Sequence, residues 1–372
     1  MPRDKNNEQP VILEGRDVWK VFGPHEQQAI EAIKAGESRN EVDRRLGTLV
    51  AVAGINFEIT RGEIFCVMGL SGSGKSTLVR HINRLVDPTA GNIFVAGQNI
   101  GELDDQALRK LRSEKIGMVF QKVALFPHWT VVDNVAFGLE VKGLSKAERR
   151  EKARDWLSRV QLDGWADRYP HELSGGMQQR VGLARALCTD PDVLLMDEPF
   201  SALDPLIRRQ LQDEFIDLSN RFGKTTLFIT HDLDEAIRLG DRIAIMREGQ
   251  FVQEGSPEEI VTRPVDDYVA SFVQGISRLH LVRAHSVMQP LDAFKGRNPT
   301  VDTACLRSVP ANAELDDLVD LKASTLDPVV VVDGDGRSVG IITVFDLLAA
   351  IQGKNAGKNE HEQEQRLVGN LA

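Results

Sequence analysis

The sequence has few cysteines, no long apolar run and no excess of basic residues. Its three cysteines, Cys66, Cys188 and Cys305, lie far apart among 372 residues and form no CxxC pair. This spacing indicates neither a zinc site nor a disulfide framework, and it is typical of a reducing cytoplasm. No apolar stretch approaches the ~20 residues that a membrane span requires, and the polar start, MPRDKNNEQP, lacks the pattern of a signal peptide. We therefore expect a cytoplasmic protein that reaches a membrane only through other chains.

The charge balance argues against nucleic acid as the main partner. There are 45 basic and 55 acidic residues, which gives a net charge of −10. Proteins that bind nucleic acid usually carry a basic footprint instead. At roughly 100–200 residues per domain, the length indicates two or three domains.

Strand and helix patterns alternate through the first three quarters of the chain. Residues 11–22 are predicted as an edge strand and residues 49–60 as a pair of strands, with two short helices, broken at Gly36, between them over 24–47. Further buried strands are predicted at 63–69, 193–199, 225–232 and 242–252. This alternation favours a mostly parallel α/β core. Past residue 280 the pattern changes to a small hairpin and a helix over 327–351, and the polar tail, 354–372, is predicted to be disordered.

The segment GLSGSGKS, residues 69–76, matches the phosphate-loop pattern G-x-x-x-x-G-K-[ST] between a predicted strand and a predicted helix. Backbone N–H groups and the helix N-terminus of such a loop hold the phosphates of a nucleotide. Lys75 is predicted to reach the β- and γ-phosphates, and the Ser76 hydroxyl to ligate Mg²⁺. The other predicted nucleotide contacts in this loop are Gly69, Ser71, Gly72, Ser73, Gly74 and Thr77. The structural alternative is a glycine turn before an ordinary helix.

A second motif, VLLMDE at 193–198, is a hydrophobic strand that ends in two carboxylates. Asp197 is predicted to hold Mg²⁺ through water. Glu198 is predicted to polarise the water that attacks the γ-phosphate. By itself such an acidic pair is usually the start of a helix, and only the phosphate loop elsewhere in the chain favours the catalytic interpretation.

Taken in order, the motifs resemble those of the ATP-binding-cassette (ABC) family. The series comprises GLSGSGKS, Gln121 in MVFQ, LSGGM at 173–177, LLMDE, SALD at 201–204 and His231 in ITHD. The likeness covers residues 11–275 and departs from the usual signature only at Met177, where many members have glutamine. It implies a P-loop NTPase cassette with a mostly parallel sheet, an antiparallel β subdomain and a helical subdomain at about 122–180.

The signature LSGGM has two glycines but no lysine, and the resemblance explains why. In this family the signature caps the γ-phosphate bound by a second cassette, so two ATP molecules lie between two head-to-tail copies. Ser174, Gly175 and Gly176 are then expected to donate hydrogen bonds to the partner's ATP, helped by a helix N-terminus. Without the other motifs, the same string would be a turn.

The resemblance also implies roles for single residues. Gln121 is expected to contact Mg²⁺ and the lytic water, and His231 to hold the γ-phosphate and orient Glu198. Asp204 is expected to contact the opposite phosphate loop. Phe22 is our choice for stacking on adenine, with Trp19 as its rival and a core role as the structural alternative.

Over long stretches around the phosphate loop and Gln121, the sequence resembles the ATPases of glycine betaine/proline-type osmoprotectant importers. The helical insert at 24–47 is typical of that branch. Residues 309–351 resemble a cystathionine-β-synthase (CBS) motif, within a small α+β domain predicted over 281–353. Such motifs normally occur in pairs, and 281–307 is at most a shortened first copy. Thr343 and Asp346 are the positions at which related domains hold adenine nucleotides; ionic sensing and dimerisation are the alternatives.

The function expected is therefore ATP hydrolysis that drives an importer for quaternary ammonium osmolytes such as glycine betaine, proline betaine or choline. The expected cofactors are ATP and Mg²⁺. The expected partners are a second copy of the chain, transmembrane permease subunits that contact 122–138, and indirectly a solute-binding protein. The expected location is the cytoplasmic face of the inner membrane, bound peripherally. Alternatives are an importer of an amino acid or polyamine, or a cassette ATPase that acts on nucleic acid.

Overall fold

A computed structural model describes residues 9–299, 301–303 and 305–352. The chain divides into two compact units, residues 1–256 and 257–372. The predicted tail, 354–372, lies outside the described residues. Within the described part, no helix combines the length and apolar character that crossing a membrane requires.

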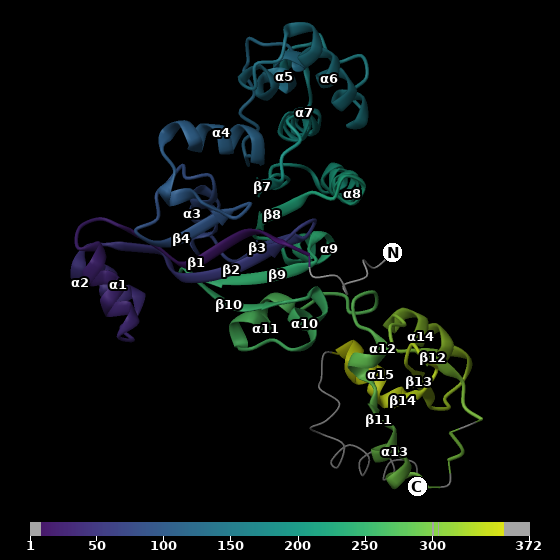
Figure 1. The fold of residues 1–372 in the computed structure, drawn as a ribbon. Coiled ribbons are helices and arrows are strands. Elements are labelled where there is room, and N and C mark those ends of the chain that lie inside the picture. The colour runs from purple at the N-terminus through teal and green to yellow at the C-terminus, as the bar shows by residue number, and fades with distance from the viewer. Residues whose placement is uncertain (1–8, 300, 304, 353–372) are drawn as a thin grey trace. The chain divides into compact units, whose positions relative to one another are not determined.

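A six-stranded sheet forms the centre of the first unit, in the order β10-β9-β3-β8-β7-β6 (Figure 1). All neighbouring pairs are parallel except β9 and β10. Because parallel strands end at the same edge, the loops that follow β3, β6, β7 and β8 lie together at that edge, where α/β proteins bind ligands. The strands are β3 (Ile64–Met68), β6 (Ile116–Val119), β7 (Val193–Asp197), β8 (Thr225–Thr230), β9 (Arg242–Arg247) and β10 (Gln250–Gly255).

A second, antiparallel sheet has the order β2-β1-β4-β5. It confirms the antiparallel β subdomain but corrects two predictions. β1 (Val11–Phe22) is not an edge strand, because it pairs with β2 on one side and β4 on the other. Residues 49–60 form one long strand, β2 (Leu49–Thr60), and not a pair. The remaining strands are β4 (Ala90–Val95) and β5 (Gln98–Asn99).

The insert after β1 is a helix pair, as predicted: α1 (Glu26–Lys34) and α2 (Arg39–Leu46). Its apolar faces pack with β1 and β2 in a cluster that includes Trp19, Ile30 and Val42. The central sheet is accompanied by α3 (Lys75–Ile82), α4 (Asp105–Lys115), α8 (Pro205–Phe222) and α9 (Leu233–Leu239).

Three helices form the helical subdomain at one end of the first unit (Figure 1). They are α5 (Val131–Val141), α6 (Lys146–Arg159) and α7 (Gly175–Cys188). The start of α6 follows from its sequence: Ser145 and Glu148 each accept a hydrogen bond from the other's backbone N–H, which is a capping box. Short 3₁₀ turns lie at Ile100–Glu102 and Pro170–Glu172.

The second unit has its own sheet, in the order β11-β14-β13-β12, and its own apolar clusters. The predicted hairpin and helix at 327–351 are confirmed as β13, β14 and α15. The order β12-α14-β13-β14-α15 occurs once in the described residues, and membership of the CBS family stays a prediction. The elements are α10 (Pro257–Thr262), α11 (Asp267–Val273), α12 (Ala284–Val287), β11 (Gln289–Pro290), α13 (Leu291–Arg297), β12 (Ser308–Pro310), α14 (Leu315–Ser324), β13 (Val329–Val332), β14 (Ser338–Ile342) and α15 (Val344–Gln352).

Candidate nucleotide-binding site

The phosphate loop joins the fully buried β3 to α3 and leaves no room for side chains at two glycines. A Cβ on Gly69 would lie 2.2 Å from the carbonyl oxygen of Met246, and one on Gly74 would lie 2.1 Å from that of Ala51. The Ser73 hydroxyl is buried and has no hydrogen-bond partner in the described part of the chain. An unsatisfied buried hydroxyl is costly, so this cradle fits an oxygen-rich group such as phosphate.

Lys75 and Ser76 begin α3 and face the acidic strand end. The Lys75 ammonium donates to the carbonyl oxygens of Gly69 (2.7 Å) and Leu70 (3.0 Å). Burial lowers the pKa of Lys75, while the nearby carboxylates of Glu198 and Asp197 oppose that shift. The Ser76 hydroxyl donates to Asp197 Oδ1 (2.9 Å).

Asp197 ends β7 and is itself buried. Burial raises the pKa of the Asp197 carboxyl, and the hydrogen bond from Ser76 opposes the rise. Because burial of an unpaired charge is unfavourable, a buried carboxylate of this kind is stabilised when it binds a cation. In the described residues, no group of three or more His, Cys, Asp or Glu side chains is arranged so that it could hold a metal ion by itself. A hydroxyl and one carboxylate nevertheless suit Mg²⁺, which usually keeps several waters.

Two predicted catalytic side chains from two other loops, His231 and Gln121, contact the predicted catalytic carboxylate of Glu198. His231 Nδ1 lies 3.0 Å from Glu198 Oε2, and Gln121 Nε2 donates to the same oxygen at 3.3 Å. Gln121 also donates to the hydroxyl of Ser201 (3.3 Å), which in turn donates to the backbone carbonyl of Glu198 (3.0 Å). The loops after β6, β7 and β8 therefore supply one connected group.

The segment SALD leads into α8, where Asp204 is the N-cap and accepts from the backbone N–H of Ile207 (3.1 Å). Arg208, on the same helix, donates to the carbonyl oxygens of Ser201 (3.4 Å) and Leu203 (3.1 Å). Its guanidinium also lies 3.5 Å from Asp232, the residue after His231. No role was predicted from the sequence for Ser201, Arg208 or Asp232. For Ser201 and Asp232 the available signal was their place in the motifs SALD and ITHD.

The signature begins α7. Ser174 is its N-cap and accepts from the backbone N–H of Met177 (3.3 Å). A Cβ on Gly176 would lie 2.7 Å from Cγ2 of Ile207, so the glycine allows α7 to approach the start of α8.

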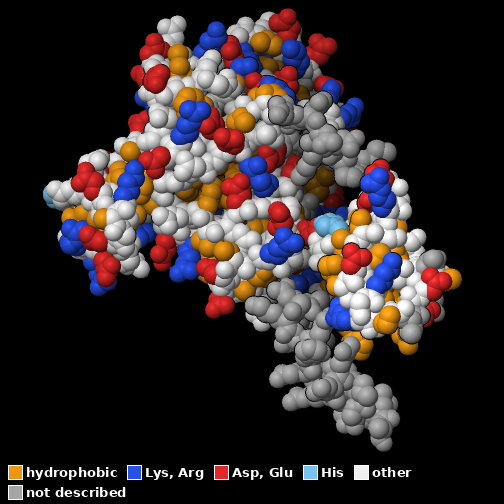
Figure 2. Space-filling view, turned by 60° about the horizontal axis from the view of Figure 1, so that its bottom comes forward, with side chains coloured by type: hydrophobic (Ala, Val, Ile, Leu, Met, Phe, Trp, Pro, Cys, Tyr) orange, Lys and Arg blue, Asp and Glu red, His pale blue; other side chains and the backbone are white. Residues whose placement is uncertain are grey.

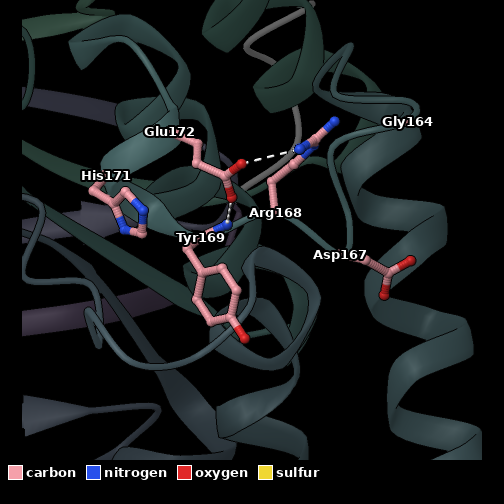
Figure 3. A pocket seen from close by; sticks show the side chains of 6 residues that line it. All are labelled: Gly164, Asp167, Arg168, Tyr169, His171 and Glu172. Atoms are coloured by element: carbon pink, nitrogen blue, oxygen red, sulfur yellow. Dashed lines mark hydrogen bonds and ion pairs between the residues drawn. The ribbon is translucent and has the colours of Figure 1, made fainter.

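A surface pocket lies in the segment that leads into the signature (Figure 3). There Glu172 accepts from the backbone N–H of Tyr169 (2.7 Å) and from Arg168 (3.0 Å). These bonds stabilise the turn before Ser174. None of the residues that line the pocket belongs to the phosphate loop, so we do not assign the nucleotide to it. The lining residues are Gly164, Asp167, Arg168, Tyr169, His171 and Glu172.

The two aromatic candidates for adenine differ in exposure. Trp19 is 3% exposed, packs with the α1–α2 insert, and donates its indole N–H to Asp17 (2.6 Å). Phe22 is 40% exposed, with the Lys20 ammonium 4.9 Å from its ring centroid. A buried and hydrogen-bonded Trp19 cannot stack on a ligand, so Phe22 remains the candidate.

Residues 122–138 carry a partly exposed aromatic cluster made of Phe126, Trp129 and Phe137. The Phe126 ring centroid lies 4.8 Å from that of Trp129 and 5.0 Å from that of Phe137. Phe126 and Trp129 are 36% and 37% exposed. Asn134, which is fully buried, fixes this turn because it accepts from the backbone N–H of Phe126 (2.7 Å) and donates to the Phe126 carbonyl oxygen (3.1 Å). The cluster thus lies on the surface and is not part of the subdomain core.

In the second unit, Asp346 is 3% exposed. Its Oδ2 accepts from the backbone N–H and the hydroxyl of Thr343 (both 2.7 Å) and from Gln289 (2.9 Å). This oxygen is therefore satisfied by the chain itself. The arrangement favours a structural cap at the start of α15 over the ribose contact that the resemblance implied.

Known proteins are similar to this chain in sequence, and solved structures are similar to it in fold. The family described as ABC transporter matches residues 52–201. The glycine betaine transport ATP-binding protein OpuAA of Bacillus subtilis is 41% identical over 96% of this chain and 98% of its own length. The glycine betaine/proline betaine transport system ATP-binding protein ProV of Salmonella typhimurium is 45% identical over 92% of this chain and 83% of its own length. A solved dimer of the ATP-binding cassette MJ0796, in a post-hydrolysis state bound to ADP and Pi, has a TM-score of 0.56 at 33% identity and covers 66% of this chain and 99% of that one.

A phosphate loop at the carboxyl edge of a parallel sheet, joined to an antiparallel β subdomain and a helical subdomain, defines an ATP-binding cassette. The chain belongs to the family of ABC transporter ATP-binding proteins, among those of glycine betaine and proline betaine transport systems. It is an ATPase whose hydrolysis is coupled to transport.

Proposed function

We propose that this chain is the ATP-hydrolysing subunit of an importer for quaternary ammonium osmolytes such as glycine betaine, proline betaine or choline. The observation that most supports ATP hydrolysis is the hydrogen-bonded group of Glu198, Gln121 and His231, which lies beside the phosphate loop that contains Lys75. The names of the similar proteins support the cargo class, because they include glycine betaine, proline betaine, carnitine and choline transport.

In this proposal each residue has a definite role. Lys75 and the loop's N–H groups hold the phosphates, and Glu198 accepts a proton from the attacking water. His231 orients Glu198 and, with Gln121, contacts the γ-phosphate region. Phosphoryl transfer depends mainly on such positioning and charge stabilisation. The remaining contacts of the loop come from Gly69, Ser71, Gly72, Ser73, Gly74, Ser76 and Thr77, and Phe22 stacks on adenine.

Mg²⁺ is the metal we propose, held by Ser76, by Asp197 through water, and by Gln121. The bound ion neutralises the charge that develops on the phosphates. The Ser76–Asp197 hydrogen bond supports this choice, because it already brings a hydroxyl and a carboxylate oxygen to within 2.9 Å of each other.

Two copies are proposed to dimerise head to tail, so that Ser174, Gly175, Gly176 and Asp204 of one chain serve the ATP of the other. Two exposed leucines support this arrangement. Leu70, in the phosphate loop, is 58% exposed, and Leu206, just past Asp204, is 70% exposed. Apolar side chains of this size at both predicted contact segments gain from being covered by a partner.

The permease subunits are proposed to contact the aromatic cluster of Phe126, Trp129 and Phe137, which attaches the chain peripherally to the inner face of the membrane. A nucleic-acid partner is disfavoured, since Lys and Arg side chains are interspersed with Asp and Glu on the face seen in Figure 2 and form no basic stripe there.

The test is reconstitution in vesicles with candidate permease and solute-binding subunits. We expect ATP-dependent uptake of labelled glycine betaine, competed by proline betaine or choline but not by glutamine or putrescine. Uptake of glutamine or putrescine instead would show that the chain serves an importer of amino acids or polyamines. Hydrolysis that no solute stimulates would contradict an import role.

A further inference from the structure

Arg185 lies on α7, the helix that begins with the signature, and contacts the loop that follows Gln121. Its Nη1 donates to the carbonyl oxygen of Ala124 (3.0 Å) and its Nη2 to that of Val123 (2.9 Å). A guanidinium presents its donors in a rigid fork. Two bonds to successive carbonyls therefore fix both the distance and the orientation of this loop relative to α7.

The same loop approaches α7 closely at a second point. A Cβ on Gly182 would lie 2.9 Å from Cγ1 of Val123, so the absence of a side chain there permits the contact. Ala124 has a φ of 45°, in the left-handed region that non-glycine residues rarely adopt. Such a conformation persists only where the surroundings hold it, and the bond from Arg185 to Ala124's own carbonyl is one such restraint.

Both ends of the loop are held elsewhere. At one end, Gln121 donates to Glu198 and Ser201 (both 3.3 Å). At the other end, Asn134 holds the backbone of Phe126 by two hydrogen bonds. The bonds from Arg185 lie between the catalytic carboxylate and the exposed aromatic cluster.

We propose that Arg185 is a positioning residue that keeps residues 121–126 at a fixed distance from the signature helix. A displacement of the aromatic cluster then moves Gln121 and Ser174 together. This inference rests on the proposed function, in which that cluster receives a permease subunit. Because Gln121 serves the chain's own ATP and Ser174 the partner's, Arg185 couples the docking surface to both ATP sites without touching nucleotide.

The experiment uses the complete transporter with glycine betaine as the probe, and measures the ratio of solute-stimulated to basal ATP hydrolysis. Arg185→Met removes the donors but keeps much of the volume, and Arg185→Lys keeps the charge without the fork. The control is Arg154→Met, which removes an exposed ion pair with Asp167 (3.1 Å) in the same subdomain. We expect the ratio to fall by about threefold to thirtyfold in Arg185→Met, less in Arg185→Lys, and to stay unchanged in the control, with nucleotide affinity unaltered throughout.

A second pair of variants tests the same contact without changing Arg185. Gly182→Ala adds a methyl group against Val123 and should lower the ratio, and the double variant Gly182→Ala/Val123→Ala should restore it. An unchanged ratio in Arg185→Met, or a loss in Gly182→Ala that the double variant does not repair, would overturn the inference. An unstimulated wild-type transporter would overturn the proposed function and this inference with it, and that outcome is seen before any substitution is made.

Discussion

Glu198 combines an unusual backbone with a carboxylate that two other side chains contact. Its φ of 46° lies in the left-handed region, and its N–H donates to the carbonyl oxygen of Ile229 on the neighbouring strand (3.0 Å). His231 and Gln121 approach its side chain from separate loops. A non-glycine residue in this conformation costs of order 1–3 kcal/mol and is typical of functional sites.

Replacing Glu198 by glutamine keeps its shape but removes the general base. We expect Glu198→Gln to bind ATP nearly as well as the wild type and to hydrolyse it roughly 10²–10⁴ times more slowly. Hydrolysis should be measured in the assembled transporter and ATP binding by equilibrium titration. Near-normal turnover would remove Glu198 from the role of base.

Substitutions of Phe22 and Trp19 should have different effects, because the first should change ATP binding and the second the stability of the fold. We expect Phe22→Ala to weaken ATP binding by about 1–3 kcal/mol, the usual value of a base–aromatic stack, without a large change in melting temperature. Trp19→Phe should lower the melting temperature, because it disturbs the packed insert, and should leave ATP affinity unchanged. If Phe22→Ala binds ATP normally and Trp19→Phe does not, the assignment is reversed.

At the same scale, the sequence predicted the residues that carry recognisable chemistry. Gln121, Glu198 and His231 were identified because their motifs occur in a specific order, and the structure brings them within hydrogen-bond distance. Arg185 and Arg208 were missed. Both donate to backbone carbonyls, and a carbonyl group has no sequence signature that reveals it as an acceptor.

At the scale of elements, α8 and α9 are joined by polar contacts beside the catalytic loops. Gln212 on α8 donates to Glu235 on α9 (2.9 Å), and both side chains are buried. One turn earlier on α8, Arg208 approaches Asp232, the N-cap of α9. Since α8 starts at the segment SALD and α9 starts directly after His231, these contacts fix the two segments relative to each other.

Glu235 should make this link sensitive to pH. Burial raises the pKa of the Glu235 carboxyl above its ordinary value of 4.5. The stability it contributes is therefore fully present below about pH 4.5 and is lost as the pH rises through the folded-state pKa. We expect the melting temperature of the wild type, relative to that of Glu235→Gln, to fall as the pH is raised above 4.5. A difference that does not change with pH would show that the pKa of Glu235 is the same in the folded and the unfolded protein.

The predictions of helices and strands were correct where the local residue pattern determines the element. They were wrong where the pairing of distant strands determines it. The break at Gly36 correctly separated α1 from α2, because Gly36 adopts a positive φ of 96° between them. By contrast, β1 was predicted as an edge strand, yet β4, which starts at Ala90, covers its free side. Long-range strand pairing of this kind is set by tertiary packing and leaves little trace in a single sequence.

At the scale of the whole molecule, residues 281–372 of the second unit are proposed to regulate and not to catalyse. Its Asp346 is already satisfied by Thr343 and Gln289. We expect a chain truncated after residue 280 to keep ATPase activity and to lose any response to ionic strength, since exposed charges are screened over ~10 Å at 0.1 M salt. Hydrolysis should be measured across a salt series in vesicles. A truncated protein with the full response of the intact chain would exclude a regulatory role for residues 281–372.

Head-to-tail pairing is the property of the whole assembly on which the proposed mechanism depends. Each composite ATP site takes Lys75 from one chain and Ser174 from the other. A defect in Lys75 can therefore be placed in one chain of a mixed dimer and a defect in Ser174 in the other chain. Lys75→Ala destroys the phosphate loop, and Ser174→Arg blocks the signature while leaving its own phosphate loop intact. ATP binding by the Ser174→Arg chain is the control that it has folded.

The most direct measurement is ATP hydrolysis by a mixture of these two variants in the assembled transporter, with co-purification of differently tagged chains to confirm mixed dimers. Each variant alone lacks a complete site and should be inactive. A mixed dimer contains one site in which an intact phosphate loop faces an intact signature, so we expect activity to return in the mixture. Mixed dimers that are as inactive as either variant alone would contradict a signature that acts on the partner's ATP.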